Sequence, residues 1–200
     1  MTLSRSTRRR EGYSLPVINT PVLVVSATAV EAAHVPARFG VLHTGIGKVD
    51  AAIAVTAALA GHPPEARPVV VNVGTAGALH DHHAGLFVPS RVVNHDLSAD
   101  VLRSLGYPAV EEISLPDGDG SVLATGDVFV TDPEQRASLA RRADLVDMEG
   151  FAIAAACARM GAVCRLVKHV SDNADESAMD WPARVDASAR ELGAWLDAHY

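Results

Sequence analysis

The feature that most constrains the fold of this chain is the segment 145–151, with the sequence LVDMEGF. An apolar pair leads into Asp147 and Glu149, which flank a methionine, and small apolar residues follow at positions 152–157. This order is typical of a buried strand that passes directly into a buried helix. In open α/β sheets, ligands bind at the carboxyl ends of such strands.

Two interpretations of Glu149 are open on these residues alone. The helix dipole favours an acidic residue in a first turn, which would make Glu149 structural. A carboxylate at the mouth of a buried helix is also costly to desolvate unless something binds it, and this favours a role in ligand binding.

Other apolar segments end in the same way. Strands are predicted at 22–25, 69–73 and 163–170, and the polar residues Glu31, Thr75 and Asp172 follow them. Taken alone, Glu31 is more typical of a solvated first-turn acid. Further strands are predicted at 86–88, 91–93, 121–123 and 128–130, and helices at 49–60, 100–107, 132–141 and 182–199. Strands that alternate with helices predict an α/β sandwich.

The helix predicted after Lys48 has an apolar face that sequence periodicity assigns to five residues. These residues are Val49, Ala52, Ile53, Ala57 and Leu59. Only 4% of the 200 residues are aromatic, although 48% are hydrophobic, so the core must consist mainly of Ala, Val and Leu.

The length of the chain suits one domain, predicted at 21–200. Residues 1–20 carry a charge of +3 and predict a flexible basic tail, with an organelle presequence as the alternative. The net charge of −7 argues against nucleic acid as a partner, and no apolar run reaches the roughly 18 residues of a membrane span. Cys157 and Cys164 lie outside any CxxC pair, which indicates reduced thiols and a cytoplasmic protein.

Two segments imitate known binding motifs. Gly47-Lys48 is not a phosphate loop, because that motif requires glycine where Leu42 stands and Ser or Thr where Val49 stands. The histidines at positions 80, 82 and 83 invite a metal interpretation, but no acid or cysteine with ligand spacing accompanies them. We predict an exposed loop there and no metal site.

Five segments together resemble the purine nucleoside phosphorylase and nucleosidase superfamily, and most closely the bacterial methylthioadenosine/S-adenosylhomocysteine nucleosidases. They are TGIGKV at 44–49, NVGTAG at 72–77, TGDVF at 125–129, VDMEG at 146–150 and VSDNAD at 170–175. The resemblance covers residues 22–180. It implies a three-layer sandwich with a mixed central sheet, nucleoside phosphorylase-like, without a cofactor.

The resemblance also implies a role for each site residue. Asp172 matches the acid that protonates or hydrogen-bonds N7 of the purine, and Glu31 matches the carboxylate that positions and deprotonates water. Glu149 matches the residue that holds the ribose 2′- and 3′-hydroxyls and stabilises the developing cation. The other implied substrate-binding residues are Met148, Thr75, Gly77, Phe129 and Ser171. The segment 95–107 resembles a part that forms the 5′ pocket across a dimer interface, so a homodimer is expected.

The sequence favours water over phosphate as the second substrate. Phosphorylases of the superfamily carry an arginine where this chain has Asn72, and no arginine lies between residues 21 and 36. A phosphate dianion would lack its bidentate partner. We therefore expect a nucleosidase acting on an adenine nucleoside such as methylthioadenosine, since Asp172 rather than Asn favours a 6-amino purine. A phosphorylase, a futalosine hydrolase and a non-catalytic nucleoside-binding protein are the alternatives.

The chain departs from the family between Glu31 and Gly45, where it is much shorter than usual. The first helix and the strand pair after it have little room, so a wall of the pocket is missing or comes from a partner subunit. Lys168 also stands where arginine is frequent.

Overall fold

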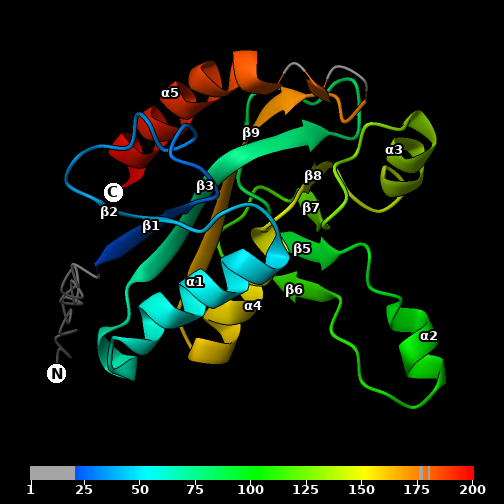
Figure 1. Cartoon of the computed structure of the whole chain (residues 1–200), viewed down its shortest axis with the longest axis horizontal. Helices are drawn as coiled ribbons and strands as arrows, with labels where there is room; N and C mark the ends of the chain where they lie inside the picture. Colours follow the sequence, from blue (N-terminus) through cyan, green and yellow to red (C-terminus); the bar gives the residue numbers. More distant parts are fainter. Residues whose placement is uncertain (1–20, 176–177, 180) are drawn as a thin grey trace, which may run out of the picture.

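The computed structural model describes residues 21–175, 178–179 and 181–200, without side-chain detail at 182–183, and the predicted tail at 1–20 lies outside this range. A nine-stranded sheet forms the centre, and helices cover both of its faces (Figure 1). Helices α1 and α4 pack together on one face, and α5 packs on β3 and β9 on the other. The mixed sheet between two helical layers confirms the predicted fold class.

The strands are β1 (Val22–Ser26), β2 (Gly40–His43), β3 (Val69–Ala78), β4 (Leu86–Phe87), β5 (Arg91–Asn94), β6 (Glu112–Ser114), β7 (Val122–Thr125), β8 (Leu145–Asp147) and β9 (Cys164–Asp172). The helices are α1 (Lys48–Ala60), α2 (Ala99–Ser104), α3 (Pro133–Leu139), α4 (Gly150–Met160) and α5 (Trp181–His199), with a 3-10 turn at Pro64–Ala66. None of these described helices combines the length and apolar character needed to cross a bilayer.

Strand β3 is the axis of the sheet because it is long enough to pair with three neighbours. Its first half pairs in parallel with β1, and β9 pairs in parallel along its other edge. Strand β8 pairs antiparallel with its last residues, Gly77 and Ala78. The carboxyl ends of β1, β3 and β9 therefore lie at one edge, and β8 leads the chain back beside the end of β3.

The apolar face predicted for α1 is wrong. The helix buries Ala51, Val55 and Leu59 in the core, whereas the side chains of Val49 and Ile53 are 68% and 64% exposed. Of the five predicted residues only Leu59 is fully buried. The helix is apolar on most sides, so its periodicity does not define a face, and packing against α4 decides which side is buried.

Two other predictions at the strand level are wrong. Residues 128–130 form no strand, because β7 ends at Thr125 and the chain crosses from there to α3. The short strand β6 lies outside every strand predicted from the sequence and pairs antiparallel with β5.

The short connection between β1 and β2 consists of turns over residues 27–39 and contains no helix. It rests on α5, where His34 Nε2 lies 2.9 Å from Asp186 Oδ1 and Arg38 contacts Asp197. The contact is close, since a Cβ added at Gly193 would lie 2.2 Å from the backbone oxygen of His34. Helix α5 therefore supports the turn that carries Glu31.

The corrected face of α1 gives a test of core packing. Val55→Ala should lower the free energy of unfolding by about 2 kcal/mol, because it empties space in the core. Ile53→Ala should change it by less than about 0.5 kcal/mol, since that side chain lies in solvent. Urea unfolding, at a concentration where the chain does not self-associate, measures both. Equal losses would contradict the observed face.

Candidate active site

A cavity of about 260 Å³ opens where the carboxyl ends of β1, β3 and β9 meet the β8–α4 junction. All eight site residues predicted from the sequence line it: Asp172, Glu31, Glu149, Met148, Thr75, Gly77, Phe129 and Ser171. Segments that are distant in the sequence are therefore brought together. Their chemical roles stay predictions.

Glu31 is buried in the turn after β1, with 5% of its surface exposed. Its Oε1 accepts hydrogen bonds from the Thr75 backbone N–H at 2.9 Å and from Thr75 Oγ1 at 2.8 Å. Its Oε2 accepts longer ones from Thr28 N at 3.2 Å and Thr28 Oγ1 at 3.0 Å. Four donors thus fix the carboxylate at the cavity, which is not the arrangement of a solvated first-turn acid.

Glu149 precedes α4 but makes no side-chain cap hydrogen bond to its own helix. Its Oε1 instead accepts a hydrogen bond from the backbone N–H of Gly47 at 2.8 Å. The purely structural interpretation of Glu149 as a first-turn acid therefore does not describe its contacts. Burial raises the pKa of Glu149 to about 7, and the charge of Asp147 adds to this effect against the opposing charge of Lys168.

Contacts between two of the sequence motifs, TGIGKV and TGDVF, hold the backbone N–H of Gly47 in position. The backbone N–H of Lys48 donates to Asp127 Oδ1 at 2.8 Å, and the Lys48 ammonium contacts Asp96. The backbone N–H of Asp127 in turn donates to Asp96 Oδ2 at 2.9 Å. The segment TGIGKV therefore holds a cavity-lining carboxylate in place through its backbone.

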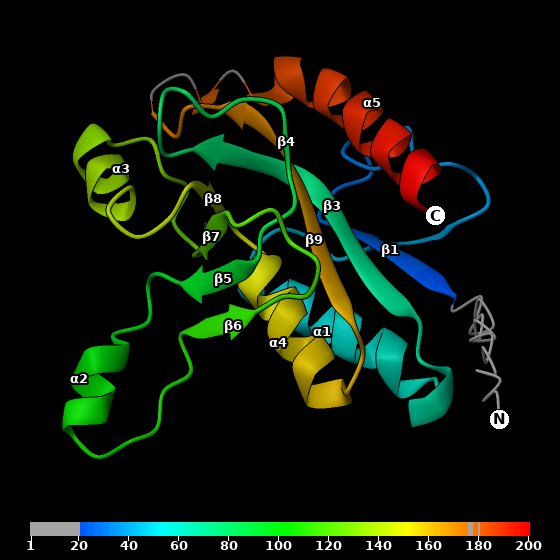
Figure 2. The ribbon, with the colours of Figure 1, turned by 180° about the vertical axis from the view of Figure 1, so that it is seen from behind.

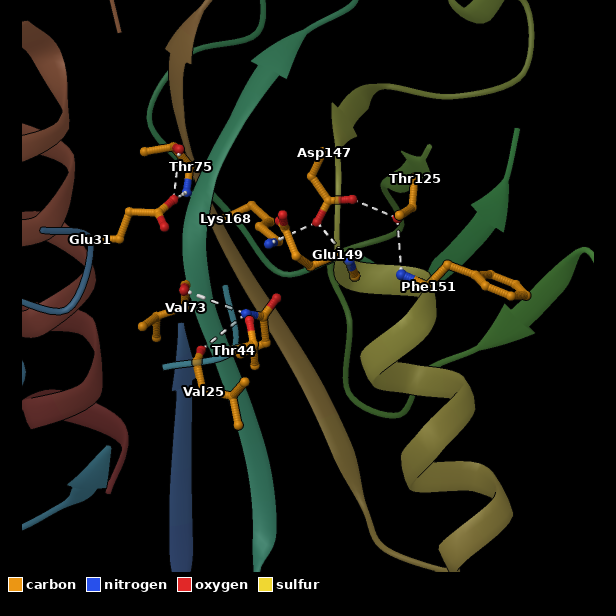
Figure 3. Close-up of polar contacts among 12 residues, drawn as sticks. Val25, Glu31, Thr44, Val73, Thr75, Thr125, Asp147, Glu149, Phe151 and Lys168 are labelled. Carbon is orange, nitrogen blue, oxygen red and sulfur yellow. Dashed lines mark hydrogen bonds and ion pairs between the residues drawn. The ribbon is translucent and has the colours of Figure 1, made fainter. Parts of the chain in front are cut away.

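A buried ion pair lies beneath the cavity and was missed by the sequence analysis (Figure 3). Lys168 Nζ is 2.8 Å from Asp147 Oδ2, and both side chains are almost fully buried. Asp147 Oδ2 also accepts from Gly150 N at 2.9 Å, and Asp147 Oδ1 accepts from Thr125 Oγ1 at 2.5 Å. The Thr125 hydroxyl oxygen accepts from Phe151 N at 2.9 Å. The network joins β7, β8, α4 and β9.

The ammonium of Lys168 stays charged in this position. Burial alone would lower its pKa, but the charge of Asp147, followed by those of Glu149 and Glu31, raises it overall. A lysine at the centre of the predicted strand 163–170, directly after the apolar pair Leu166 and Val167, was the signal in the sequence that could have indicated a buried acidic partner.

Asp172 is the last residue of β9 and is also buried. Its Oδ1 accepts from Ala174 N at 2.8 Å, and its Oδ2 accepts from Ser171 Oγ at 2.7 Å. Gly77 is needed beside it, because an added Cβ would lie 2.9 Å from Ala174 Cβ and 3.0 Å from Asp172 Oδ1. The small residue therefore lets β3 approach the carboxylate closely.

Thr28 and Trp181 are among the lining residues that were not predicted from the sequence. Thr28 supports Glu31, and Trp181 at the start of α5 donates from Nε1 to Thr75 Oγ1 at 2.8 Å. Trp181 lies beyond the last of the five motifs, so nothing in the sequence pattern drew attention to it.

The histidine-rich loop after β3 packs its rings on one another. The ring centroids of His82 and His83 are 4.3 Å apart, and His83 Nδ1 lies 3.2 Å from the backbone oxygen of Asp144. Among the described residues, no group of three or more His, Cys, Asp or Glu side chains is placed to hold a metal ion.

The cavity is strongly acidic. Glu31, Asp147, Glu149 and Asp172 line it, and the described lining residues include no lysine, arginine or histidine. The ammonium of Lys168 lies behind this lining and is paired with Asp147. Such a field favours a ligand that is neutral or becomes positively charged, and it opposes an anion.

Comparison with known proteins agrees with this geometry. Residues 34–198 match the family model described as the phosphorylase superfamily. The aminodeoxyfutalosine nucleosidase of Helicobacter pylori is 33% identical over 119 residues, which are 58% of this chain and 50% of that protein, so the chain spans about half the length of this relative. The 5′-methylthioadenosine/S-adenosylhomocysteine nucleosidase of Shewanella halifaxensis is 27% identical over 160 residues, 68% of each protein.

Solved structures share the fold at low sequence identity. A mutant of the Helicobacter pylori methylthioadenosine nucleosidase, with 5′-methylthioadenosine in its active site, superposes with a TM-score of 0.79 at 21% identity and covers 90% of this chain and 98% of that one. Futalosine hydrolase from the same organism gives a TM-score of 0.76 at 22% identity, with coverage of 90% and 96%. Since the family model matches most of the chain, this protein belongs to the phosphorylase superfamily.

Proposed function

We propose that this protein is a purine nucleosidase, which hydrolyses the N-ribosidic bond of an adenine nucleoside of the methylthioadenosine/S-adenosylhomocysteine kind. The observation that carries the proposal is the convergence of Glu31, Glu149 and Asp172 on one acidic cavity. The curated relatives, which are named as nucleosidases, support the same reaction class.

The proposed mechanism uses each carboxyl group once. The bond between the ribose C1′ and the purine breaks, and its electron pair leaves with the base, which Asp172 protonates or hydrogen-bonds at N7. The oxygen of a water molecule bonds to C1′ while its proton passes to Glu31. Glu149 binds the 2′- and 3′-hydroxyls, and its negative charge stabilises the positive charge that develops on the ribose.

Water suits the cavity better than phosphate does. The carboxylates repel a dianion, and the charge of Lys168 is already paired with Asp147. Asn72, which stands where phosphorylases carry an arginine, donates from Nδ2 to the backbone oxygen of Val25 at 3.0 Å and so joins β3 to β1. These contacts favour a hydrolase over a phosphorylase.

A futalosine-type nucleoside is the second candidate substrate. The relative with 33% identity is an aminodeoxyfutalosine nucleosidase, and the adenine and ribose contacts proposed here would serve both substrates. The two differ in the group at the 5′ position.

Product analysis tests the reaction. Purified protein should release free base from methylthioadenosine equally with and without phosphate, with free ribose sugar as coproduct on chromatography. Adenosine, inosine and futalosine rank the substrates. Asp172→Asn should lower the rate by about 10²–10⁴ fold, because the departing base loses its proton donor. Release only with phosphate would show a phosphorylase, and binding without release would show a nucleoside-binding protein.

Glu149→Gln should raise the stability of the protein at pH 8 while it weakens the proposed function. The folded chain holds the Glu149 proton up to pH about 7. The unfolded chain releases it near pH 4.5, so the free energy of unfolding falls as the pH rises through this window. The amide has no charge to bury, so at pH 8 the variant should be more stable, by on the order of 3 kcal/mol. Ribose binding and turnover should weaken.

The measurement is the unfolding temperature between pH 5 and pH 8, with Glu134→Gln on the exposed start of α3 as the control. A Glu149→Gln variant with the same pH dependence as the wild type would contradict a buried titrating carboxyl. Unchanged kinetics would contradict its role in sugar binding.

We also propose that the protein is a cytoplasmic homodimer. Its two cysteines are free, which supports a reducing compartment. Val49 and Ile53 expose apolar side chains on α1, and Ile46, Val128 and Phe129 do so at the cavity. The arm that carries α2 projects from the body and exposes Val101, Leu105, Tyr107 and Val110 (Figure 2). Exposed apolar groups of this extent are typical of an interface.

A charge placed on α1 tests the dimer. Ile53→Glu should convert a dimer into a monomer in light scattering after gel filtration, since burying the carboxylate in an apolar interface is costly. Val163→Glu, at an exposed apolar position just before β9 begins, is the matched control and should stay dimeric. A monomeric wild type, or an Ile53→Glu dimer, would contradict the proposed interface.

A further inference from the structure

Trp181 links the helical layer above the sheet to the residue proposed to activate water. It is the first residue of α5, which packs on β3 and β9 (Figure 1). Its indole Nε1 lies 2.8 Å from Thr75 Oγ1, and its side chain lines the cavity. The proposed mechanism does not use this contact.

The direction of each hydrogen bond in this contact is determined by the chemistry of the groups. An indole N–H only donates, so the Thr75 hydroxyl oxygen must accept from Trp181. The hydroxyl has one proton of its own, and an ionised carboxylate only accepts. That proton therefore points to Glu31 Oε1, which is 2.8 Å away. The chain of donors runs from Trp181 through Thr75 to Glu31.

This series of hydrogen bonds makes the two carboxylate oxygens of Glu31 differ in how firmly they are held. Oε1 receives two contacts from Thr75, at 2.8 and 2.9 Å. Oε2 receives two longer ones from Thr28, at 3.0 and 3.2 Å. Because successive hydrogen bonds polarise one another, the indole strengthens the contacts on Oε1 and leaves Oε2 as the oxygen that is less firmly held.

We propose that Trp181 is a positioning residue for Glu31, which commits Oε1 to Thr75 and leaves Oε2 to take the proton of the attacking water. This inference rests on the proposed nucleosidase function. In that step an O–H bond of water breaks, its proton bonds to Oε2, and the water oxygen bonds to C1′ as the base leaves with the electron pair of the C1′–N bond. Without the indole, the Thr75 hydroxyl is free to rotate away from Glu31.

A packing role alone makes a different prediction. If Trp181 only fills a wall of the cavity, phenylalanine should replace it with little effect on turnover, because the ring is kept. If the indole N–H matters, phenylalanine should lower turnover although it keeps the ring. The Trp181→Phe variant therefore separates the two roles.

Nuclear magnetic resonance tests the hydrogen bond without using activity. The chain has two tryptophans, so its ¹⁵N-labelled indole groups give two signals, which Trp195→Phe assigns. Thr75→Val should shift the Trp181 signal and speed its exchange with solvent by about tenfold, and should leave the Trp195 signal in place. An unchanged Trp181 signal would show that the bond to Thr75 is absent and would overturn the inference.

Kinetics test the positioning role. Trp181→Phe should lower kcat by about tenfold, with KM within twofold, because substrate contacts remain while Glu31 is less well placed. The acid limb of the pH profile should move to higher pH, since the ionised carboxylate loses support. The charged groups near Glu31, Lys168 on β9 and Glu149 before α4, are retained in this variant. Trp195→Phe, in the same helix but away from the cavity, should match the wild type.

The outcomes are distinguishable. A Trp181→Phe variant with wild-type kcat and pH profile, or with a change in KM alone, would overturn the positioning role and leave the proposed function standing. A wild-type protein that hydrolyses no nucleoside would overturn the proposed function and this inference with it, whatever the indole signals show.

Discussion

The site depends on the buried ion pair between Asp147 and Lys168. Two charges removed from water are costly unless their remaining hydrogen-bonding capacity is satisfied. Here Thr125 and the backbone N–H of Gly150 satisfy the carboxylate, and three neighbouring acidic groups stabilise the ammonium. Since these groups come from four elements, the hydrogen-bonding capacity of the pair is satisfied as described only when β7, β8, α4 and β9 are all in place.

The same pair sets the electrostatic character of the cavity. Lys168 offsets the charge of Asp147 from behind the lining, and the other acidic groups face the cavity without a basic residue among the described lining residues. Burial destabilises the Glu149 anion, and among the described residues the hydrogen bond that holds its carboxylate comes from the backbone N–H of Gly47. A group in that state gains most from a ligand that brings hydroxyl donors and a developing positive charge. The cost of burying the charge of Glu149 in the free protein would therefore fall as the proposed reaction places positive charge beside it.

Local order along the chain predicted the class of the fold, and the resemblance to a known superfamily singled out residues that line one cavity. Strands ending in polar residues are visible as patterns, and Glu31, Glu149 and Asp172 each follow one. The buried face of α1 was not predictable, since a helix of Ala, Val and Ile carries no clear periodicity and its partner α4 decides the outcome. Trp181 and the pairing of Lys168 were missed because they depend on contacts between distant elements.

The close contact between Gly193 and the backbone of His34 has a consequence for how this protein can change over evolutionary time. Because no helix lies between β1 and β2, the turn that carries Glu31 is short, and its contacts with α5 support its conformation. The methyl group of an alanine at position 193 would clash with the backbone oxygen of His34 and push the turn away from α5. Substitutions on the side of α5 that contacts this turn would therefore affect the placement of Glu31, whereas exposed positions on the opposite side of the helix do not make this contact.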